Sequence, residues 1–541
     1  MWATLCLSVA TAASPPGPLT VPSGEWPQWG GSPSRNNATH GKDIPITWDV
    51  GKFDPKTNHW LGSPDRQVRW VARLGSQTYG SPVVADGKVF CGTNNGAGYL
   101  PRYPAKVDLG CLLCFNAADG RFLWQYSCEK LSAGRKVDWP EQGLCCAPMV
   151  EGNRLWTVTS RGEVVCLDTE GSGVRRNRAP STVAPLANPA TADTLWSLDM
   201  MHRLGVVQRY MCSCSVTAAG DLLLVNTSNG VDLDDKLPAP EAPSFIALDK
   251  HTGALVWADH SPGRNILEGQ WSSPAFAILN GVGQAIFAGG DGWVYSFLAE
   301  KTPDGKGHLL WKFDCNPKDA SWEGGGNGRR NHIVATPVIY KGRIYIGTGQ
   351  DPEAGEGPGD LWCIDPTHRG DVSAEIVVDR QGKPVAPRRL RAVNPDAGEQ
   401  VRPNPNSAAV WHYRGPSSPP GGQADFKKTM HRTLGMPAIA NGLLVIGDFA
   451  GLVHCLDAAS GQVRWTYDTM AAIWGSPLIV DGKIYLGNED GDVLVFQLGP
   501  TAKLLGKNAM GNAVYGSAVV AGNVLYVATR THLFAIAGKG R

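Results

Sequence analysis

One pattern of apolar and polar positions recurs along the chain. Each copy opens with a small residue, often followed by proline, passes through β-branched residues to a glycine turn, and then reads apolar-Tyr-apolar-Gly; the clearest copy is Trp474–Gly487. A second glycine turn, an apolar run ending in Asp, a Thr-Gly or Ser-Gly turn and a tryptophan complete the unit. Short β-branched and aromatic runs between glycine turns predict strands, so each copy predicts a small antiparallel sheet.

The copies are eight in number and closely spaced. Six open with a proline, and Ser215 and Ala518 take that place in two others: Pro82, Pro148, Pro274, Pro337, Pro437 and Pro477. A step of about 40 residues suits four strands with tight turns and matches the blade period of β-propellers. A unit of this size cannot bury its own apolar face, so the copies must pack against one another. The sequence therefore predicts an all-β, eight-bladed β-propeller built from four-stranded antiparallel blades.

The two ends of the repeat array predict how the ring closes. The eighth copy ends at Ile536, before its fourth strand, and Arg69-Trp70 precede the first copy. An N-terminal strand that completes the last blade would remove both exposed sheet edges. We expect residues 26–541 to form a single propeller, with surface-loop insertions at 171–193 and 366–409 that lack apolar periodicity.

Glycine turns and tryptophans mark the second half of each unit. Asp291-Gly292, Asp490-Gly491 and Asn229-Gly230 follow the second strand, and Asp-Gly and Asn-Gly there predict type I′ hairpin turns with positive φ at both residues. Six copies then carry a fourth-strand tryptophan: Trp124, Trp196, Trp257, Trp311, Trp411 and Trp465. The seventh copy has Leu504-Leu505 instead.

Composition excludes some classes of function. The net charge is +1, which gives no electrostatic reason to expect nucleic acid or an anionic membrane as a partner. No apolar run reaches the ~20 residues that span a bilayer. Residues 1–25 contain the small-residue-rich stretch Leu5–Ala13, for which we expect a signal peptide, the alternative being a disordered tail. Export predicts a periplasmic, cell-envelope or secreted protein.

The 13 cysteines do not form an obvious disulfide framework. Four of them occupy one position of the repeat, where other copies have Ala or Ser: Cys114, Cys166, Cys363 and Cys455. We expect these thiols to be small core residues between packed sheets. For Cys145, Cys146 and Cys212, free buried thiols, a bond between the adjacent pair and a Cys145–Cys212 cross-link all remain open.

A ring of eight residues lies three positions before the opening proline of each copy. It comprises Tyr79, Cys145, Cys212, Trp271, Val334, Leu434, Trp474 and Tyr515. We expect these residues near one end of the central channel, where the aromatic rings either plug it or offer flat faces to a planar ligand. The glycine-rich loop Lys318–Arg330 departs from the repeat and is either a ligand-contacting loop at the channel or an ordinary surface loop. Asp291, Asp448, Asp490 and Glu489 recur at hairpin positions, so we assign them to turns.

Taken together, the opening Glu25–Gly31 (Glu-Trp-Pro-Gln-Trp-Gly-Gly) and the repeated Leu-Asp, Thr-Gly and Trp positions resemble the pyrroloquinoline-quinone (PQQ) type propeller repeat. That superfamily contains quinoprotein alcohol dehydrogenases and BamB-like propellers, which bind proteins in the cell envelope without a cofactor. The chain is similar to large envelope proteins of the second kind.

Part of the chain also resembles the dehydrogenase site. The resemblance implies Cys145 and Cys146 as a vicinal disulfide against the quinone, Trp271 as its aromatic platform, and Glu323 as catalytic base where the enzymes have Asp. Trp474 and Arg329 would be further cofactor contacts. Two departures concern calcium, because residues 226–230 and 288–291 stand where the enzymes present a calcium-binding Glu and Asn. A hard cation needs several oxygen ligands, and the metal site is therefore unknown.

The sequence favours a non-catalytic binding or scaffold protein of the cell envelope, with a protein partner and no cofactor. The alternative is a quinoprotein-like oxidoreductase, in which Glu323 accepts a proton as hydride passes from an alcohol to PQQ held with calcium. A small-molecule ligand in the channel, carbohydrate binding and another enzyme activity are further alternatives. The insertion at 366–409 is a candidate partner-facing loop, because variable loops on a rigid ring are where such folds place function.

Overall fold

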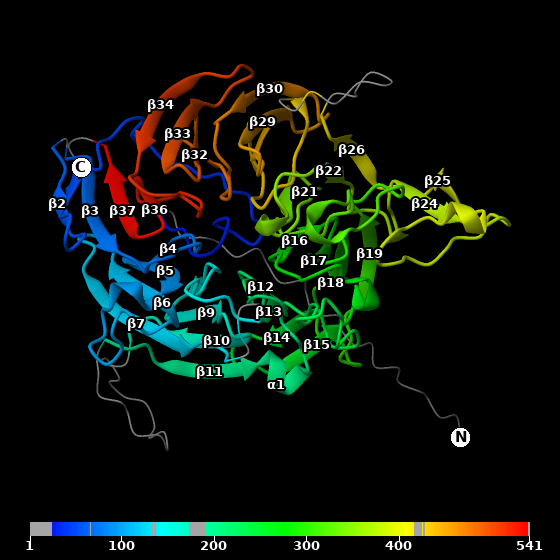
Figure 1. The fold of residues 1–541 in the computed structure, drawn as a ribbon, viewed down its shortest axis with the longest axis horizontal. Coiled ribbons are helices and arrows are strands. Elements are labelled where there is room, and N and C mark those ends of the chain that lie inside the picture. The colour runs from blue at the N-terminus through cyan, green and yellow to red at the C-terminus, as the bar shows by residue number, and fades with distance from the viewer. Residues whose placement is uncertain are drawn as a thin grey trace, which may run out of the picture.

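Eight four-stranded antiparallel sheets stand around a common axis in the computed structural model, which confirms the predicted propeller (Figure 1). The structure describes residues 24–538 except 65, 133, 135–136, 172–189, 416–424 and 426–427. The expected signal peptide, up to residue 23, and most of the insertion at 171–193 lie outside the described residues.

Seven blades take their strands from consecutive segments of the chain, and the eighth takes its fourth strand from the N-terminal segment. From the innermost strand to the outermost, the first blade is β4 (Val83–Ala85), β5 (Lys88–Asn94), β6 (Leu109–Asn116) and β7 (Phe122–Glu129); the second is β8 (Met149–Glu151), β9 (Arg154–Val158), β10 (Glu163–Asp168) and β11 (Thr194–Asp199); and the third is β12 (Thr217–Ala219), β13 (Leu222–Asn226), β14 (Phe245–Asp249) and β15 (Leu255–Asp259). The fourth blade is β16 (Ala275–Leu279), β17 (Val282–Ala288), β18 (Trp293–Leu298) and β19 (Leu309–Asp314); the fifth is β20 (Val338–Tyr340), β21 (Arg343–Gly347), β22 (Leu361–Ile364) and β26 (Ala409–Tyr413); and the sixth is β27 (Ala438–Ala440), β28 (Leu443–Gly447), β29 (Leu452–Asp457) and β30 (Val463–Asp468). The seventh blade is β31 (Leu478–Val480), β32 (Lys483–Gly487), β33 (Asp492–Gln497) and β34 (Leu504–Ala509), and the eighth is β35 (Val519–Ala521), β36 (Val524–Ala528), β37 (His532–Ala537) and β3 (Val68–Arg73).

The last blade confirms the predicted closure. Its outer strand is β3, which pairs antiparallel with β37, and Trp70 lies opposite Ala535. Because both ends of the chain share this sheet, the ring has no unpaired blade at which it can open.

A small residue on the third strand faces the fourth-strand tryptophan in seven blades. The pairs are Cys114 with Trp124, Cys166 with Trp196, Ala247 with Trp257, Ser296 with Trp311, Cys363 with Trp411, Cys455 with Trp465, and Ala535 with Trp70. The four cysteines in this set are buried free thiols, which confirms their packing role. Each pair is followed by a register shift, and the seventh blade, which has no tryptophan, shows the same shift after Val495, so the shift belongs to the blade and not to the indole.

The seventh blade lacks this tryptophan, and other residues fill the corresponding space. Gly506 lies opposite Val495, and a side chain at Gly506 would collide with the backbone oxygen of Ile46. The N-terminal segment fills the space: Asn508 donates to the Ile46 carbonyl at 2.9 Å, and its own side-chain oxygen accepts from the Trp48 N–H at 2.9 Å.

The type I′ prediction is wrong for the turns to which it was assigned. Asp291, Asp490 and Asn229 do not have positive φ, and the residues around Asp291 form a four-residue loop in which the Trp293 N–H donates to the Asp291 carboxylate. The turns with two positive-φ residues join the first and second strands: Asp86-Gly87, Asn280-Gly281, Lys341-Gly342, Asn441-Gly442, Asp481-Gly482 and Gly522-Asn523. The carboxylate or amide after the second strand instead caps a longer loop through its side chain.

The insertion at 366–409 has more structure than its sequence indicates. Its start adds β23 (Gly370–Asp371) parallel to β19, and β24 (Glu375–Val378) pairs with β25 (Gln400–Pro403) as a hairpin. The hairpin projects beyond the rim of the ring (Figure 1). A second small sheet, β1 (Lys52–Phe53) with β2 (Trp60–Gly62), lies in the N-terminal segment.

Helix is scarce in the described part of the chain. The α-helix found there is α1 (Met200–Leu204), and no helix among those residues has the length and apolar character needed to cross a bilayer.

We predict that Trp124→Ala lowers the free energy of unfolding by about 3–5 kcal/mol, the usual cost of deleting a large buried aromatic side chain. Trp124 is 1% exposed, and its indole donates to the Thr169 carbonyl of the next blade at 2.9 Å. Denaturant titration followed by circular dichroism measures the change. Leu255→Ala, at a fourth-strand position that is 44% exposed, is the control and should change stability by less than ~0.5 kcal/mol. Equal effects of the two substitutions would contradict the docking role.

Candidate functional site at the channel mouth

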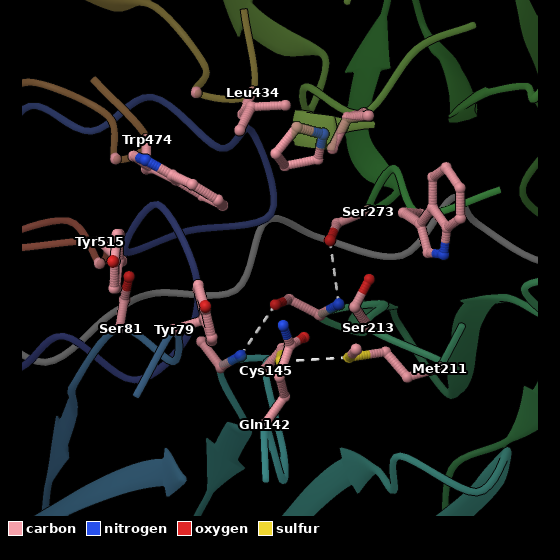
Figure 2. Close-up of a pocket in the computed structure, with 18 of the residues that line it drawn as sticks. Tyr79, Ser81, Gln142, Cys145, Met211, Ser213, Ser273, Leu434, Trp474 and Tyr515 are labelled. Carbon is pink, nitrogen blue, oxygen red and sulfur yellow. Dashed lines mark hydrogen bonds between the residues drawn. The ribbon is translucent and has the colours of Figure 1, made fainter. Parts of the chain in front are cut away.

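A cavity of about 400 Å³ lies at one end of the central channel, and we call it the channel mouth. Seven of the eight ring residues from the sequence line it, including Tyr79, Cys145, Trp271, Trp474 and Tyr515. They extend from the segments that lead into the innermost strands, so each blade contributes at the same level (Figure 2). The predicted clustering of these residues is confirmed.

Cys212 is the exception, and its placement in the ring was wrong by one residue. In the third blade Ser213 lines the mouth. Val216, rather than Ser215, directly precedes β12, which is the place that the opening proline holds in other blades. A one-residue shift turns a side chain to the other face of an extended segment. Cys212 therefore packs in the core with Cys146 and Cys214.

Short serine side chains just below the ring join neighbouring blades. The Ala147 N–H donates to Ser215 Oγ at 2.9 Å, and the Ser215 N–H donates to Ser273 Oγ at 2.9 Å (Figure 2). The same bond joins later blades: Met436 N to Ser476 Oγ, Ser476 N to Ser517 Oγ, and Ser517 N to Ser81 Oγ. These bonds hold the inner segments, and hence the ring of the mouth, in fixed positions.

The N-terminal arm, Trp26–Lys42, closes the channel beneath the mouth. It passes once round the ring and is bonded to the inner strand or first turn of every blade. In order, the partners are Trp26 with Val84, Pro27 with Val150, Gln28 with Thr217, Pro33 with Phe276, Ser34 with Ile339, Asn36 with Ile439, Asn37 with Ile479, and Lys42 with Asn523. Trp29 faces upward as part of the cavity lining, and its indole donates to Thr336 Oγ1 at 3.1 Å.

Two features of the arm explain its opening sequence. Gly30 and Gly31 both have positive φ, and a side chain on either would collide, with the Arg35 backbone or the Trp26 ring. Arg35 is fully buried and donates to the carbonyls of Trp29, Ser215 and Pro274 at 2.6–2.8 Å. Burial lowers the pKa of its guanidinium to about 9.

The two adjacent cysteines point in different directions. Cys145 reaches the mouth, and its sulfur lies 3.3 Å from Met211 Sδ (Figure 2). Cys146 is buried, and its sulfur lies 3.1 Å from the Val158 carbonyl and 3.2 Å from Thr157 Oγ1. Both are free thiols, and burial raises the pKa of each.

The residues that the resemblance offered for catalysis do not reach the mouth. Glu323 is exposed and accepts a hydrogen bond from Ser321 Oγ at 3.2 Å. Arg329 is about half exposed and forms an ion pair with Asp319 at 3.5 Å. Among the described residues, neither belongs to the cavity lining, whereas Trp271 and Trp474 do.

The acidic residues assigned to turns have structural partners. Asp291 is buried and accepts from Tyr295 Oη at 2.6 Å; burial raises its pKa to about 6. Asp448 accepts from His431 Nδ1 and His454 Nε2, and despite burial these bonds lower its pKa to about 2.

Several lining residues were not found by the sequence analysis. Trp139, Tyr210 and Met211 come from the segments before the second and third inner strands, and Asp351 and Glu353 come from the loop after β21. Their common signal is position, because each lies on a connection at the end of the ring that carries the aromatic residues. Asp351 accepts from the Glu353 N–H at 2.8 Å, and burial together with the nearby Glu268 raises its pKa to about 7.

Comparison with known proteins connects this geometry to a family. The family model described as "Outer membrane protein assembly factor BamB" matches residues 108–399 and 386–536. The chain belongs to the PQQ-type, BamB-like β-propeller family.

Curated relatives match about half of the chain. The outer membrane protein assembly factor BamB of Shewanella oneidensis is 34% identical over 305 residues, 52% of this chain and 60% of the relative. That of Yersinia pestis is 25% identical over 282 residues, 51% of this chain and 58% of the relative. The chain thus spans about three fifths of the length of these relatives.

The fold of this chain is shared by solved structures of a BamB protein and of a quinohemoprotein alcohol dehydrogenase. BamB from Moraxella catarrhalis aligns with a TM-score of 0.50 at 13% identity over 86% of this chain and 98% of its own. A quinohemoprotein alcohol dehydrogenase from Pseudomonas putida aligns with a TM-score of 0.53 at 12% identity over 96% and 81%. At these identities the likeness shows the fold alone.

The lining of the mouth does not fit the quinone of the dehydrogenases. PQQ is a flat tricarboxylate, and the described lining contains two carboxylates, Asp351 and Glu353, with no Lys, Arg or His. Bringing like charges together in a partly closed cavity is unfavourable.

The residues at the expected calcium positions do not fit that ion either. Asn226 uses its amide within the fold, donating to the Ser272 carbonyl and accepting from the Ser228 N–H. Within the described residues, no group of three or more His, Cys, Asp or Glu side chains is arranged to hold a metal ion.

We predict that Arg35→Ala loosens the arm and lowers the free energy of unfolding by at least ~2 kcal/mol, because buried carbonyls such as those of Ser215 and Pro274 lose their donor. Limited proteolysis should cut the arm faster in the variant, and denaturant titration should show the loss. Arg264→Ala, whose side chain is 80% exposed, is the matched control. An arm that stays as resistant to protease as in the wild type would argue against this anchor.

Proposed function

We propose that the chain is a non-catalytic binding or scaffold protein of the cell envelope that engages a protein partner and carries no resident cofactor. The observation that carries the proposal is the family match over residues 108–536, whose model and curated relatives are named as outer membrane protein assembly factors. By this proposal the chain contributes to the assembly of outer membrane proteins.

The structure supports a rigid platform. Strand closure at β3, the serine bonds between blades and the circuit of the arm each tie distant parts of the chain together. A ring held in this way loses little conformational entropy when it binds a partner, which favours affinity.

The insertion is the surface that we assign to the partner. All four residues of β25 are exposed, so the hairpin presents a strand edge beyond the rim. The hairpin is tied to the ring, because Arg389, in the connection between its two strands, donates to the carbonyls of Ile266 and Leu267 at 2.7 and 2.9 Å. An exposed, firmly held strand is suited to pairing with an extended segment of another protein.

We predict that a photo-crosslinking amino acid at Val401, on β25, forms a discrete adduct with an envelope protein in the native host. The same label at Leu504, a comparably exposed position on the seventh blade, is the control and should give none. Mass spectrometry of the adduct identifies the partner. Adducts of equal yield at both positions, or none at Val401, would remove the insertion as the partner surface.

A genetic experiment tests the scaffold role itself. Loss of the protein should reduce the outer membrane protein content of the envelope, measured by quantitative mass spectrometry, and the wild-type chain should restore it. An envelope unchanged by the loss would contradict the scaffold proposal even if the crosslink were found.

The alternative function, a quinoprotein-like oxidoreductase, is tested separately. After incubation with PQQ and Ca²⁺ and gel filtration, we expect no quinone absorbance to remain with the protein and no dye reduction with primary alcohols, because the lining is acidic. A known quinoprotein dehydrogenase treated in parallel is the positive control. Retained quinone that is lost in Trp271→Ala would favour the dehydrogenase.

A further inference from the structure

The channel mouth is an aromatic cavity. Seven of its lining residues carry aromatic rings: Trp29, Tyr79, Trp139, Tyr210, Trp271, Trp474 and Tyr515. Six of them form two groups, with Trp139 beside Tyr210 in the second. Tyr79 is stacked on Tyr515 at 4.8 Å with Trp474 beside both, and Tyr210 is stacked with Trp271 at 5.9 Å. Aromatic faces carry negative charge density and attract cations.

The side chains of the lining that are charged above pH 7 have the same sign. Asp351 and Glu353 both face the cavity, and no basic side chain is part of the described lining. Behind the lining, Glu268 accepts from Tyr210 Oη at 3.2 Å, and Glu489 accepts from the Trp474 indole at 3.2 Å. Each aromatic group therefore has a carboxylate next to it.

The basic residues near the mouth do not cancel this charge. Arg209 is bonded to Glu268 at 2.9 Å and to Asp235 at 3.0 Å, and its guanidinium lies over the Tyr210 ring. Arg530 lies outside the lining; its positive charge lowers the pKa of Tyr79 and Tyr515, and the negative charge of Glu489 raises it. The cavity thus remains acidic around a predominantly aromatic wall.

The cavity is also the right kind of space for a small ligand group. Its volume of about 400 Å³ falls within the ~300–1,000 Å³ of small-molecule sites. The arm closes it from below through Trp29, so a ligand enters from the open face of the ring.

We propose that the channel mouth binds an organic cation, an ammonium or guanidinium group with apolar substituents. The rings supply faces for the apolar part and for the charge, and Asp351 and Glu353 supply opposite charge. The cation is either a free small molecule or a Lys or Arg side chain of a peptide. This site stands independently of the proposed scaffold role, since neither the crosslink nor the envelope content measures it.

The test uses choline, n-butylguanidinium and 3,3-dimethyl-1-butanol, the neutral carbon analogue of choline, each titrated by calorimetry and tryptophan fluorescence. We expect saturable binding of a cation and at least tenfold weaker binding of the neutral analogue. Equal binding of choline and its analogue, or no binding of either cation, would overturn the proposal. So would saturable binding of a neutral disaccharide without binding of a cation.

A lysine peptide and its Nε-acetylated form distinguish the two sources. Tighter binding of the lysine peptide than of the free cations, lost on acetylation, identifies a protein side chain as the ligand. Tighter binding of a free cation identifies a small molecule. Either result supports the proposal.

Asp351→Asn and Trp474→Leu test the assigned contacts. Asn at 351 keeps a side-chain oxygen that can still accept from the Glu353 N–H, so the fold should persist while cation affinity falls about tenfold. Glu241→Gln, which removes an exposed carboxylate away from the lining, is the matched control. Unchanged affinity in both Asp351→Asn and Trp474→Leu would place any binding elsewhere.

The pH dependence gives a second readout. The pKa of Asp351 is about 7, set by burial, Glu268 and Glu353 against Arg209, and protonation removes its charge. Cation affinity should therefore be full at pH 8 and fall as the pH drops to 6, and Asp351→Asn should weaken this dependence. A pH-independent affinity would contradict the role of Asp351.

Discussion

The ring depends on the contact between one blade's outer tryptophan and the next blade. The indole N–H donates to a backbone carbonyl of the neighbouring blade in five places, the donors being Trp70, Trp124, Trp196, Trp411 and Trp465. In four of these contacts, all but that of Trp465, a turn glycine lies against the indole; a side chain at Gly120 would lie 2.5 Å from Trp70. A large apolar surface and one directed hydrogen bond thus fix both the distance and the angle between blades. Trp257 packs between blades without such a bond among the described residues.

The exceptions show how strict this constraint is. In the fourth blade, Trp311 donates to Gln284, which in turn donates to the Pro366 carbonyl where the insertion begins. In the seventh blade, where the tryptophan is missing, Gly506 and the N-terminal segment around Ile46 fill the gap. In these two blades the departure from the repeat is compensated by another part of the chain.

The sequence was sufficient for the repeat and the number of blades, because one local pattern recurs eight times, and for the closing strand, because the last copy lacks its fourth strand. It also predicted the small core residues of the third strands, but not that they lie opposite tryptophan. The sequence was not sufficient for features that occur only once among the blades. The shift from Cys212 to Ser213 depends on an alignment of one residue, and the circuit of the arm depends on contacts such as that of Arg35 with Pro274, more than 200 positions away. Glu323 illustrates the limit of a resemblance: a short motif match suggested its role but not the direction of its side chain, which lies outside the mouth.

The segments that lead into the inner strands both hold the ring together and line its mouth. Ser215 and Ser273 join neighbouring blades through hydroxyl and backbone and also belong to the lining, and the Trp271 indole in the lining donates to the Arg209 carbonyl at 3.1 Å. The docking tryptophans lie apart from these residues, on the fourth strands, so lining residues can differ without disturbing them. BamB and a quinohemoprotein alcohol dehydrogenase share the fold.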